Sequence, residues 1–103
     1  MGYVYVAEFS DGVIKVGSSN RIKSRINVLK NNYRRETGAN LLRVWISPYY
    51  IDYRELEKEF HWMFSKDRIP HKDEFYRIPF ATAVCVLQGG NIEIQPLLIS
   101  VIG

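Results

Sequence analysis

The side chains best suited to chemistry lie near the N-terminus: the phenol of Tyr5, the amine of Lys15 and the guanidinium of Arg25. Two short runs with strand character carry Tyr5, Lys15 and Gly17, and a helix that follows carries Arg25 one to two turns in. A phenol, an amine and a guanidinium around one point suit a phosphate group and a proton that must be moved. The pattern therefore predicts a phosphate-processing site close to Gly17.

Whether Tyr5 and Lys15 meet depends on the register of the predicted hairpin, with strands at residues 3–9 and 13–17. A two-residue turn places them on opposite faces, because a shift of one residue turns every side chain over. A three-residue loop, with Gly12 in the left-handed conformation of a bulge, places them on the same face. We predict the second register because it also gathers four β-branched residues on the opposite face, namely Val4, Val6, Ile14 and Val16.

A helix is predicted over residues 20–34, after a Ser18-Ser19-Asn20 run that favours a helix start. Arg25 lies on the shoulder of the apolar stripe of this helix, where it can reach over the edge of the sheet. The stripe recurs at spacings of four, three and four residues, through Ile22, Ile26, Leu29 and Tyr33.

Positive charge is concentrated in the same region. Residues 12–35 contain seven of the fourteen basic side chains and no acidic one, whereas the net charge of the whole chain is only +3. This distribution is typical of a surface that binds a polyanion, although a solvated helix face has the same composition. The residues predicted to contact nucleic acid are Arg21, Lys23, Lys30, Arg34 and Arg35.

The chain is predicted to form a single small α/β (α+β) domain over residues 1–103, long enough to bury one hydrophobic core. The predicted architecture is a small antiparallel sheet in β-β-α-β-α order flanked by helices, with an additional C-terminal helix and strand. After the first helix, we expect a strand over 41–47 and a helix over 53–66. Asp52 would begin that helix, and its apolar face would include Met63. A strand over 75–78, a helix from Pro79 to about Leu87 and an edge strand over 91–101 would follow.

Composition argues against several classes of protein. The one cysteine, Cys85, lies in an apolar run and is predicted to be a small buried side chain rather than a nucleophile. The N-terminus lacks a basic segment followed by an apolar stretch, and the apolar run at 96–102 is too short to span a bilayer. The predicted compartment is therefore the cytoplasm, with no membrane partner.

Residues 3–25 resemble the start of the GIY-YIG nuclease superfamily. In that pattern the first strand ends in a tyrosine, the second ends in Tyr-Ile-Gly, and an arginine follows on the first helix. Here Tyr3-Val4-Tyr5 stands at the first position and Lys15-Val16-Gly17 at the second. Arg25 follows Gly17 by eight residues, as the family arginine does.

Two later segments extend the resemblance. The helix that carries Glu57 and His61 fits the acidic helix of the family, and Asp73–Tyr76 looks like the Glu-Trp-Phe strand of the short, phage-type branch. The resemblance covers roughly residues 2–78 and leaves 79–103 as a C-terminal extension. It implies a phage or mobile-element origin, and hence the cytoplasm of an infected host.

The resemblance implies a metal-dependent endonuclease that hydrolyses DNA phosphodiester bonds with Mg²⁺ or Mn²⁺. Glu57 would hold the metal, because magnesium is commonly bound by one carboxylate, phosphate oxygens and water. Arg25 would clamp the phosphate with two hydrogen bonds. Tyr5 or Lys15 would be the base, and the residues leave that choice open. His61, one helical turn after Glu57, would contact a phosphate or orient Glu57.

Alternatives to these roles also follow from the residues. Glu57 and Arg25 also occur on solvated surfaces or in salt bridges, and Tyr5 also suits aromatic packing across the hairpin. Tyr3 would support Tyr5, and Gly17 would allow backbone to approach substrate closely or simply end the strand. The family usually has tyrosine in place of Lys15, and its late asparagine is matched poorly by Asn91.

These departures motivate two rival functions. One is a catalytically silent module that binds nucleic acid through the basic helix. The other is a protein-interaction factor, such as a phage-coded inhibitor of a host enzyme. The apolar strand at 91–102 would then pair with a partner's sheet edge or with its own copy in a homodimer.

Overall fold

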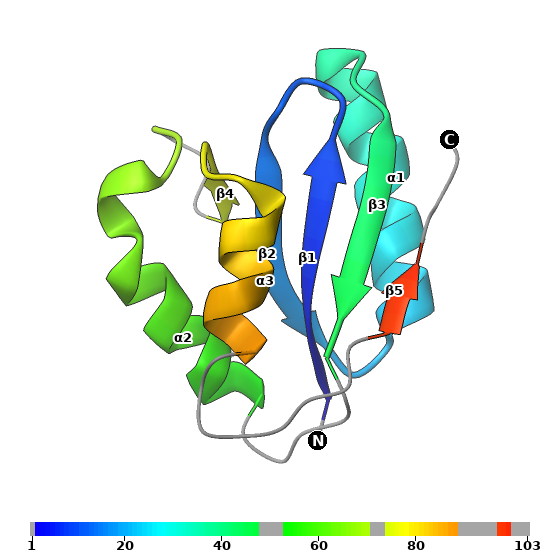
Figure 1. The fold of residues 1–103 in the computed structure, drawn as a ribbon. Helices are drawn as coiled ribbons and strands as arrows, with labels where there is room; N and C mark the ends of the chain where they lie inside the picture. Colours follow the sequence, from blue (N-terminus) through cyan, green and yellow to red (C-terminus); the bar gives the residue numbers. More distant parts are fainter. Residues whose placement is uncertain (1, 48–52, 71–73, 89–96, 100–103) are drawn as a thin grey trace.

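One antiparallel sheet forms the centre of the molecule (Figure 1). The structure is a computed structural model that describes residues 2–47, 53–70, 74–88 and 97–99. Within those residues the sheet has five strands in the order β4-β2-β1-β3-β5. They are β1 (Tyr3–Phe9), β2 (Ile14–Ser19), β3 (Leu41–Ile46), β4 (Phe75–Tyr76) and β5 (Leu97–Ile99).

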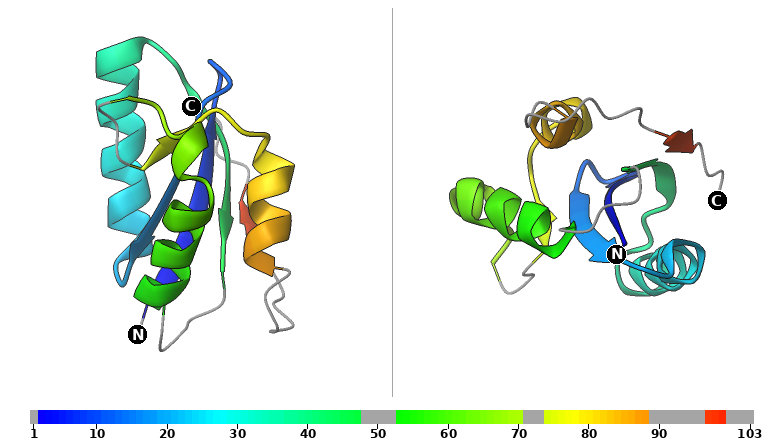
Figure 2. Two further views of the ribbon diagram at one scale, coloured as in Figure 1. Left: turned by 90° about the vertical axis from the view of Figure 1, so that its left-hand side faces the viewer. Right: turned by 90° about the horizontal axis from the view of Figure 1, so that it is seen from below.

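Helices cover both faces of this sheet, so the molecule has three layers (Figure 2). The helices are α1 (Ile22–Thr37), α2 (Tyr53–Met63) and α3 (Phe80–Gln88), with a 3₁₀ turn, η1 (Ser65–Asp67), after α2. The helix α1 packs on one face, and α2 and α3 pack on the other. The predicted α+β class and the β-β-α-β-α order with an added helix and strand are confirmed.

The hairpin of β1 and β2 adopts the predicted register. The Phe9 N–H donates to the Val13 carbonyl at 3.0 Å, and Gly12 closes the three-residue loop with a φ of +84°. Ala7 therefore lies opposite Lys15, and Tyr5 and Lys15 share a face of the sheet. A left-handed φ is the reason for glycine at position 12, since other residues are strained there.

The two faces of the sheet carry separate apolar layers. The β-branched residues of the hairpin point to α2 and α3, where they surround Phe60 and the fully buried Trp45. The predicted stripe of α1 packs on the opposite face against Tyr5 and Phe9. A functional site that draws on both layers must therefore lie at an edge of the sheet.

The start of α1 differs from the prediction. The helix begins at Ile22 without a side-chain cap, because Ser19 lies in β2 and its hydroxyl accepts the Arg21 N–H in a tight turn. The helix continues to Thr37, three residues beyond the expected end. Gly38 then ends it in the left-handed conformation, at φ +78°.

Two predictions of burial were wrong. Met63 is 56% exposed because α2 ends at this residue, and Phe60 and Phe64 fill the space beneath the helix instead. Cys85 is also exposed, because Ala83 and Leu87 define the buried side of α3.

The C-terminal strand is an edge strand, as predicted. Within residues 97–99, β5 pairs antiparallel with β3 through Leu97 and Ile46. Asp52, Asn91 and the remainder of the predicted strand lie outside the described residues. No helix among the described residues is long and apolar enough to cross a membrane.

Candidate functional site

The ring of Tyr5 lies directly over Gly17, its partner across the hairpin. A Cβ atom at position 17 would stand 2.6 Å from the Tyr5 hydroxyl oxygen, which is closer than real Cβ contacts. Glycine is therefore needed here for the Tyr5 ring to lie flat on the strand, a packing known from other sheet glycines. The reason for Gly17 is a contact within the protein, which differs from both reasons predicted from the sequence.

Burial dominates the electrostatics of Tyr5, which is 1% exposed. Burial raises the pKa of its phenol above the ordinary value of 10.0, and the nearby Glu74 and Glu57 carboxylates add to the rise. Arg25 opposes it, which places the guanidinium within electrostatic range of the phenol. The phenol therefore keeps its proton at neutral pH and is a hydrogen-bond donor.

Glu57 projects from α2 toward the end of β2. The Ser18 hydroxyl donates a hydrogen bond to its Oε1, and the His61 Nε2 lies 2.9 Å from its Oε2. Burial acts to raise the pKa of Glu57, but the hydrogen bonds from His61 and Ser18, together with the nearby Glu74, outweigh it and lower the pKa. The Glu57 side chain is 13% exposed and ionised at neutral pH.

Glu74 joins this group from the segment that leads into β4. Its backbone carbonyl accepts the Val16 N–H at 3.0 Å, which fixes it beside β2. Its carboxylate lies 3.2 Å from the Lys15 Nζ, and that amine also lies over the ring of Phe75 at 5.4 Å. Lys15 is therefore an ion-paired residue with a 14% exposed side chain rather than a solvated strand lysine.

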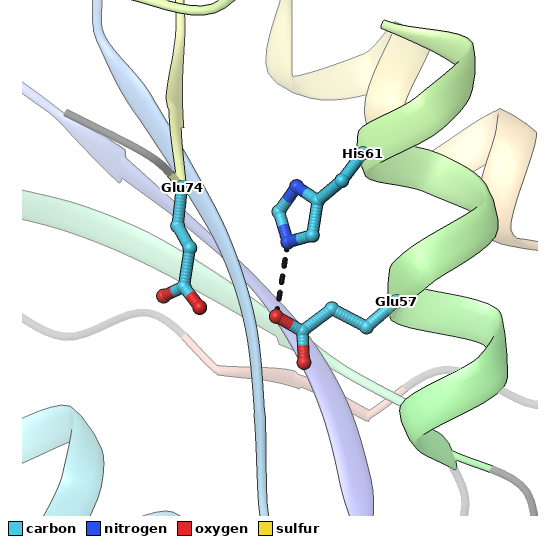
Figure 3. A group of neighbouring side chains, drawn as sticks. All are labelled: Glu57, His61 and Glu74. Carbon is cyan, nitrogen blue, oxygen red and sulfur yellow. Dashed lines mark hydrogen bonds and ion pairs between the residues drawn. The ribbon is translucent and has the colours of Figure 1, made fainter. Parts of the chain in front are cut away.

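Glu57, His61 and Glu74 form a group that can hold a metal ion (Figure 3). One ligand atom from each lies within 4.8 Å of the other two. The Glu57 and Glu74 side chains point toward one another, and the His61 ring lies beside the Glu57 carboxylate. Two carboxylate oxygens and one imidazole nitrogen are donors that divalent cations accept, so the residues fit the implied metal.

The second ring nitrogen of His61 is also engaged. Its Nδ1 makes a hydrogen bond with the hydroxyl of Tyr76, a fully buried residue of β4. The two rings stack with an interplanar angle of 13°. Tyr76 thus holds the imidazole with Nε2 facing Glu57.

Arg25 lies on the α1 side of the site and is exposed. It lines two adjoining hollows along α1, of about 350 and 220 Å³, and Val28 lines both as well. The smaller hollow also contains Lys15, so the guanidinium and the amine border one space. The two hollows form a groove along α1, and its lining includes the cations of Arg21, Arg25 and Lys15 and the Glu36 carboxylate.

The remaining predicted residues lie on β1 and on or beside α1. Tyr3 is half-buried against the α1 layer, on the same face as Tyr5. Arg21 stands at the mouth of the larger hollow. Of the five predicted nucleic-acid contacts, Lys30 is half-buried. The other four are exposed, namely Arg21, Lys23, Arg34 and Arg35.

Two site residues were missed from the sequence. Glu74 was part of the segment likened to a Glu-Trp-Phe strand, and that likeness was the signal that could have identified it. Ser18 was assigned to helix capping, whereas its place in β2 directs the hydroxyl to Glu57. Both depend on contacts across the sheet edge, which local patterns do not reveal.

The chain matches a known protein family. A family model, the T5orf172 domain, matches residues 2–88, which include all of α1, α2 and α3. The chain therefore belongs to the T5orf172 domain family, and this membership is consistent with a nuclease-like or nucleic-acid-related role. Comparison with curated proteins and with solved structures finds no match.

Proposed function

We propose that this protein is a metal-dependent endonuclease of the GIY-YIG type that hydrolyses phosphodiester bonds in DNA. The observation that carries the proposal is that Tyr5, Lys15, Arg25 and Glu57 gather around β2, with Lys15 near its start and Glu57 bonded to Ser18 near its end. They come from four elements, β1, β2, α1 and α2, and from both apolar layers. Packing accounts for Tyr5, which belongs to the α1 layer, but gives no reason for Lys15, Arg25 and Glu57 to lie beside it.

Glu57 would hold Mg²⁺ or Mn²⁺, and the ion would supply charge neutralisation at the leaving oxygen and an activated water. The low pKa of Glu57 keeps its carboxylate available as a ligand at neutral pH. Ser18 fixes one carboxylate oxygen through its hydrogen bond. Contacts within the protein thus keep the Glu57 carboxylate charged and hold it in position.

The other groups act on the phosphate. Arg25 is exposed at the junction of the two hollows, where its guanidinium can bind two phosphate oxygens at once. The protonated Tyr5 phenol is a hydrogen-bond donor, and because it is 1% exposed, a contact with a phosphate oxygen or the attacking water requires the side chains over it to move. Because Tyr5 keeps its proton, Lys15 is the remaining candidate for the base. To accept a proton from water it must leave its ion pair with Glu74 and first lose its own proton.

The basic side chains of α1 would hold the DNA strand through its phosphates. Contacts of this kind weaken as salt rises, because each neutralised phosphate releases counterions. We therefore expect single substitutions such as Lys23→Gln to weaken binding and reduce its salt dependence without changing the cleavage position.

The test is cleavage of supercoiled plasmid and of single-stranded DNA in the presence of Mg²⁺ or Mn²⁺. The wild-type chain should nick or linearise at least one substrate, and Glu57→Gln and Arg25→Ala should abolish cleavage. Glu55→Gln is the matched control, because Glu55 is an exposed carboxylate of the same helix that pairs with Lys58 at 3.6 Å. Intact DNA with folded wild-type protein and both metals would refute a nuclease acting on these substrates.

The ion pair between Lys15 and Glu74 favours a second function, nucleic-acid binding without turnover. A lysine held by a carboxylate neutralises charge but accepts no proton. This function predicts salt-dependent DNA binding in a gel-shift assay with no cleavage by any variant. Cleavage lost in Glu57→Gln would exclude it.

A further inference from the structure

The hydrogen-bond partners of His61 distinguish it from a histidine that lies on a helix surface in contact with solvent. Its Nδ1 is engaged by the buried Tyr76 hydroxyl, while its Nε2 faces the Glu57 carboxylate at 2.9 Å. Histidines that bind metals almost always use one ring nitrogen as the ligand and the other for an orienting hydrogen bond. Nε2 here donates its hydrogen to the Glu57 carboxylate. As a metal ligand it would give up that proton, with Nδ1 donating to Tyr76 and the Nε2 lone pair facing the ion.

The spacing of the donor atoms suits a common ion. Two ligands about 2.1 Å from a metal and at right angles to each other are about 3.0 Å apart. The Nε2 of His61 and the Oε2 of Glu57 are separated by 2.9 Å, so both can bind one ion without moving. Glu74 lies within 4.8 Å of both and is 41% exposed, so a rotation of its side chain completes the set.

The charges of the group also favour a cation. Glu57 and Glu74 bring two carboxylates together beside an imidazole, and the side chains of Glu57 and His61 are only 13% and 20% exposed. Lys15 neutralises Glu74 alone, at 3.2 Å. A divalent ion between the carboxylates would neutralise both.

We propose that Glu57, His61 and Glu74 together bind one divalent transition-metal ion, such as Mn²⁺ or Zn²⁺, in preference to Mg²⁺. Imidazole nitrogen is a good ligand for transition metals, whereas magnesium takes oxygen ligands and keeps most of its water. Three protein ligands leave further positions open for water and substrate, as in catalytic zinc sites. The inference deepens the proposed function by adding two ligands to Glu57 and a metal class, but binding itself does not require that the protein cut DNA.

Metal binding by the whole purified chain, measured by calorimetry with Mn²⁺, Zn²⁺ and Mg²⁺ in separate titrations, tests the proposal. We expect Mn²⁺ and Zn²⁺ to bind at least about 10-fold more tightly than Mg²⁺. His61→Gln and Glu74→Gln should each weaken Mn²⁺ and Zn²⁺ binding by about 100-fold, and His61→Gln should leave Mg²⁺ binding nearly unchanged. Glu59→Gln, an exposed carboxylate two residues from Glu57 and so on another side of α2, should bind all three ions as wild type does.

Tyr76→Phe separates orientation from ligation. It leaves all three ligands in place and removes the hydroxyl that holds His61, so affinity for Mn²⁺ and Zn²⁺ should fall by about 10- to 100-fold. Pulsed electron paramagnetic resonance of wild-type protein with Mn²⁺ provides a readout that needs no variant. A nitrogen hyperfine coupling from the imidazole is expected.

The proposal is overturned if that nitrogen coupling is absent, if Mg²⁺ binds as tightly as Mn²⁺ and Zn²⁺, or if His61→Gln binds them as wild type does. DNA cleavage, assayed separately, distinguishes this failure from failure of the proposed function. Metal binding as expected with intact DNA would refute the nuclease alone. Cleavage with Mn²⁺ whose dependence on metal concentration is unaffected by His61→Gln would refute the three-ligand site alone.

Discussion

Substituting Gly17 by alanine tests the arrangement at the centre of the site. The added Cβ would lie 2.6 Å from the Tyr5 hydroxyl oxygen, 2.7 Å from Cζ and 3.0 Å from Cε2, whereas ordinary contacts begin at 3.4 Å. The phenol must therefore move by about 0.8 Å, the difference between 3.4 and 2.6 Å. Tyr5 is 1% exposed, so the movement takes place inside a packed layer.

Two effects of Gly17→Ala follow from this movement. Overpacking of a core costs about 1–3 kcal/mol, and each kcal/mol lowers the melting temperature of a domain this size by about 4–8 °C. A reacting group displaced by nearly 1 Å costs about 100-fold in rate. Thermal unfolding followed by circular dichroism and plasmid cleavage measure the two effects.

Two further variants isolate the cause. Gly38→Ala has nothing within 4 Å of its added Cβ but a φ of +78°, so it should lose about 1–2 kcal/mol through backbone strain and keep its activity. In a Tyr5→Leu background, which lacks the three crowded atoms, Gly17→Ala should cost less than about 1 kcal/mol. Wild-type stability and cleavage in the single Gly17→Ala variant would refute the contact with Tyr5.

Three other perturbations have expected outcomes. Ser47→Ala should destabilise the fold by about 1–3 kcal/mol in urea unfolding, because the buried Val4 N–H donates to the Ser47 hydroxyl at 2.9 Å; an unchanged midpoint would contradict this. Tyr33→Phe should cost about 1.5–3 kcal/mol, since it removes a 2.7 Å hydrogen bond to the Asp11 carboxylate and keeps the ring, and a loss below 0.5 kcal/mol by the same measurement would count against it. For Glu57, hydrogen bonds hold the pKa in the folded protein below the ordinary value of 4.5. The ionised carboxylate therefore stabilises the fold above pH 4.5, and this stabilisation is lost as pH falls through the folded-state pKa. The difference in melting temperature between wild type and Glu57→Gln should therefore shrink below pH 4.5, and a difference that stays constant from pH 7 to pH 3 would refute the assignment.

The hairpin was predictable because local chemistry and burial agree there. Gly12 permits the left-handed loop, and the same register buries four β-branched residues on one side. Once the register is known, the common face of Tyr5 and Lys15 follows by alternation along the strands. The stripe of α1 was predictable for the same reason, since its spacing is that of a helix with one buried side.

The acidic part of the site was only half predictable. Glu57 and His61 lie one turn apart, so their proximity follows from helix geometry. Glu74 reaches them because β4 pairs with β2. These two strands are far apart in the sequence, and β4 contributes only two residues to the pairing. The burial of Tyr5 beneath the groove likewise depends on how α1 packs, and no local pattern reports it.

The same long-range pairing determines when the site exists. The Ser18 hydroxyl meets a carboxylate 39 residues further along the chain, and Lys15 meets one from the segment before β4. Contacts between such distant segments form late, after loop-closure entropy has been overcome. On the ribosome, β4 must emerge before the last of these residues can be placed. Under the proposed function, a truncated or half-made chain would therefore carry the basic helix without an assembled acidic centre, and would bind nucleic acid without cutting it.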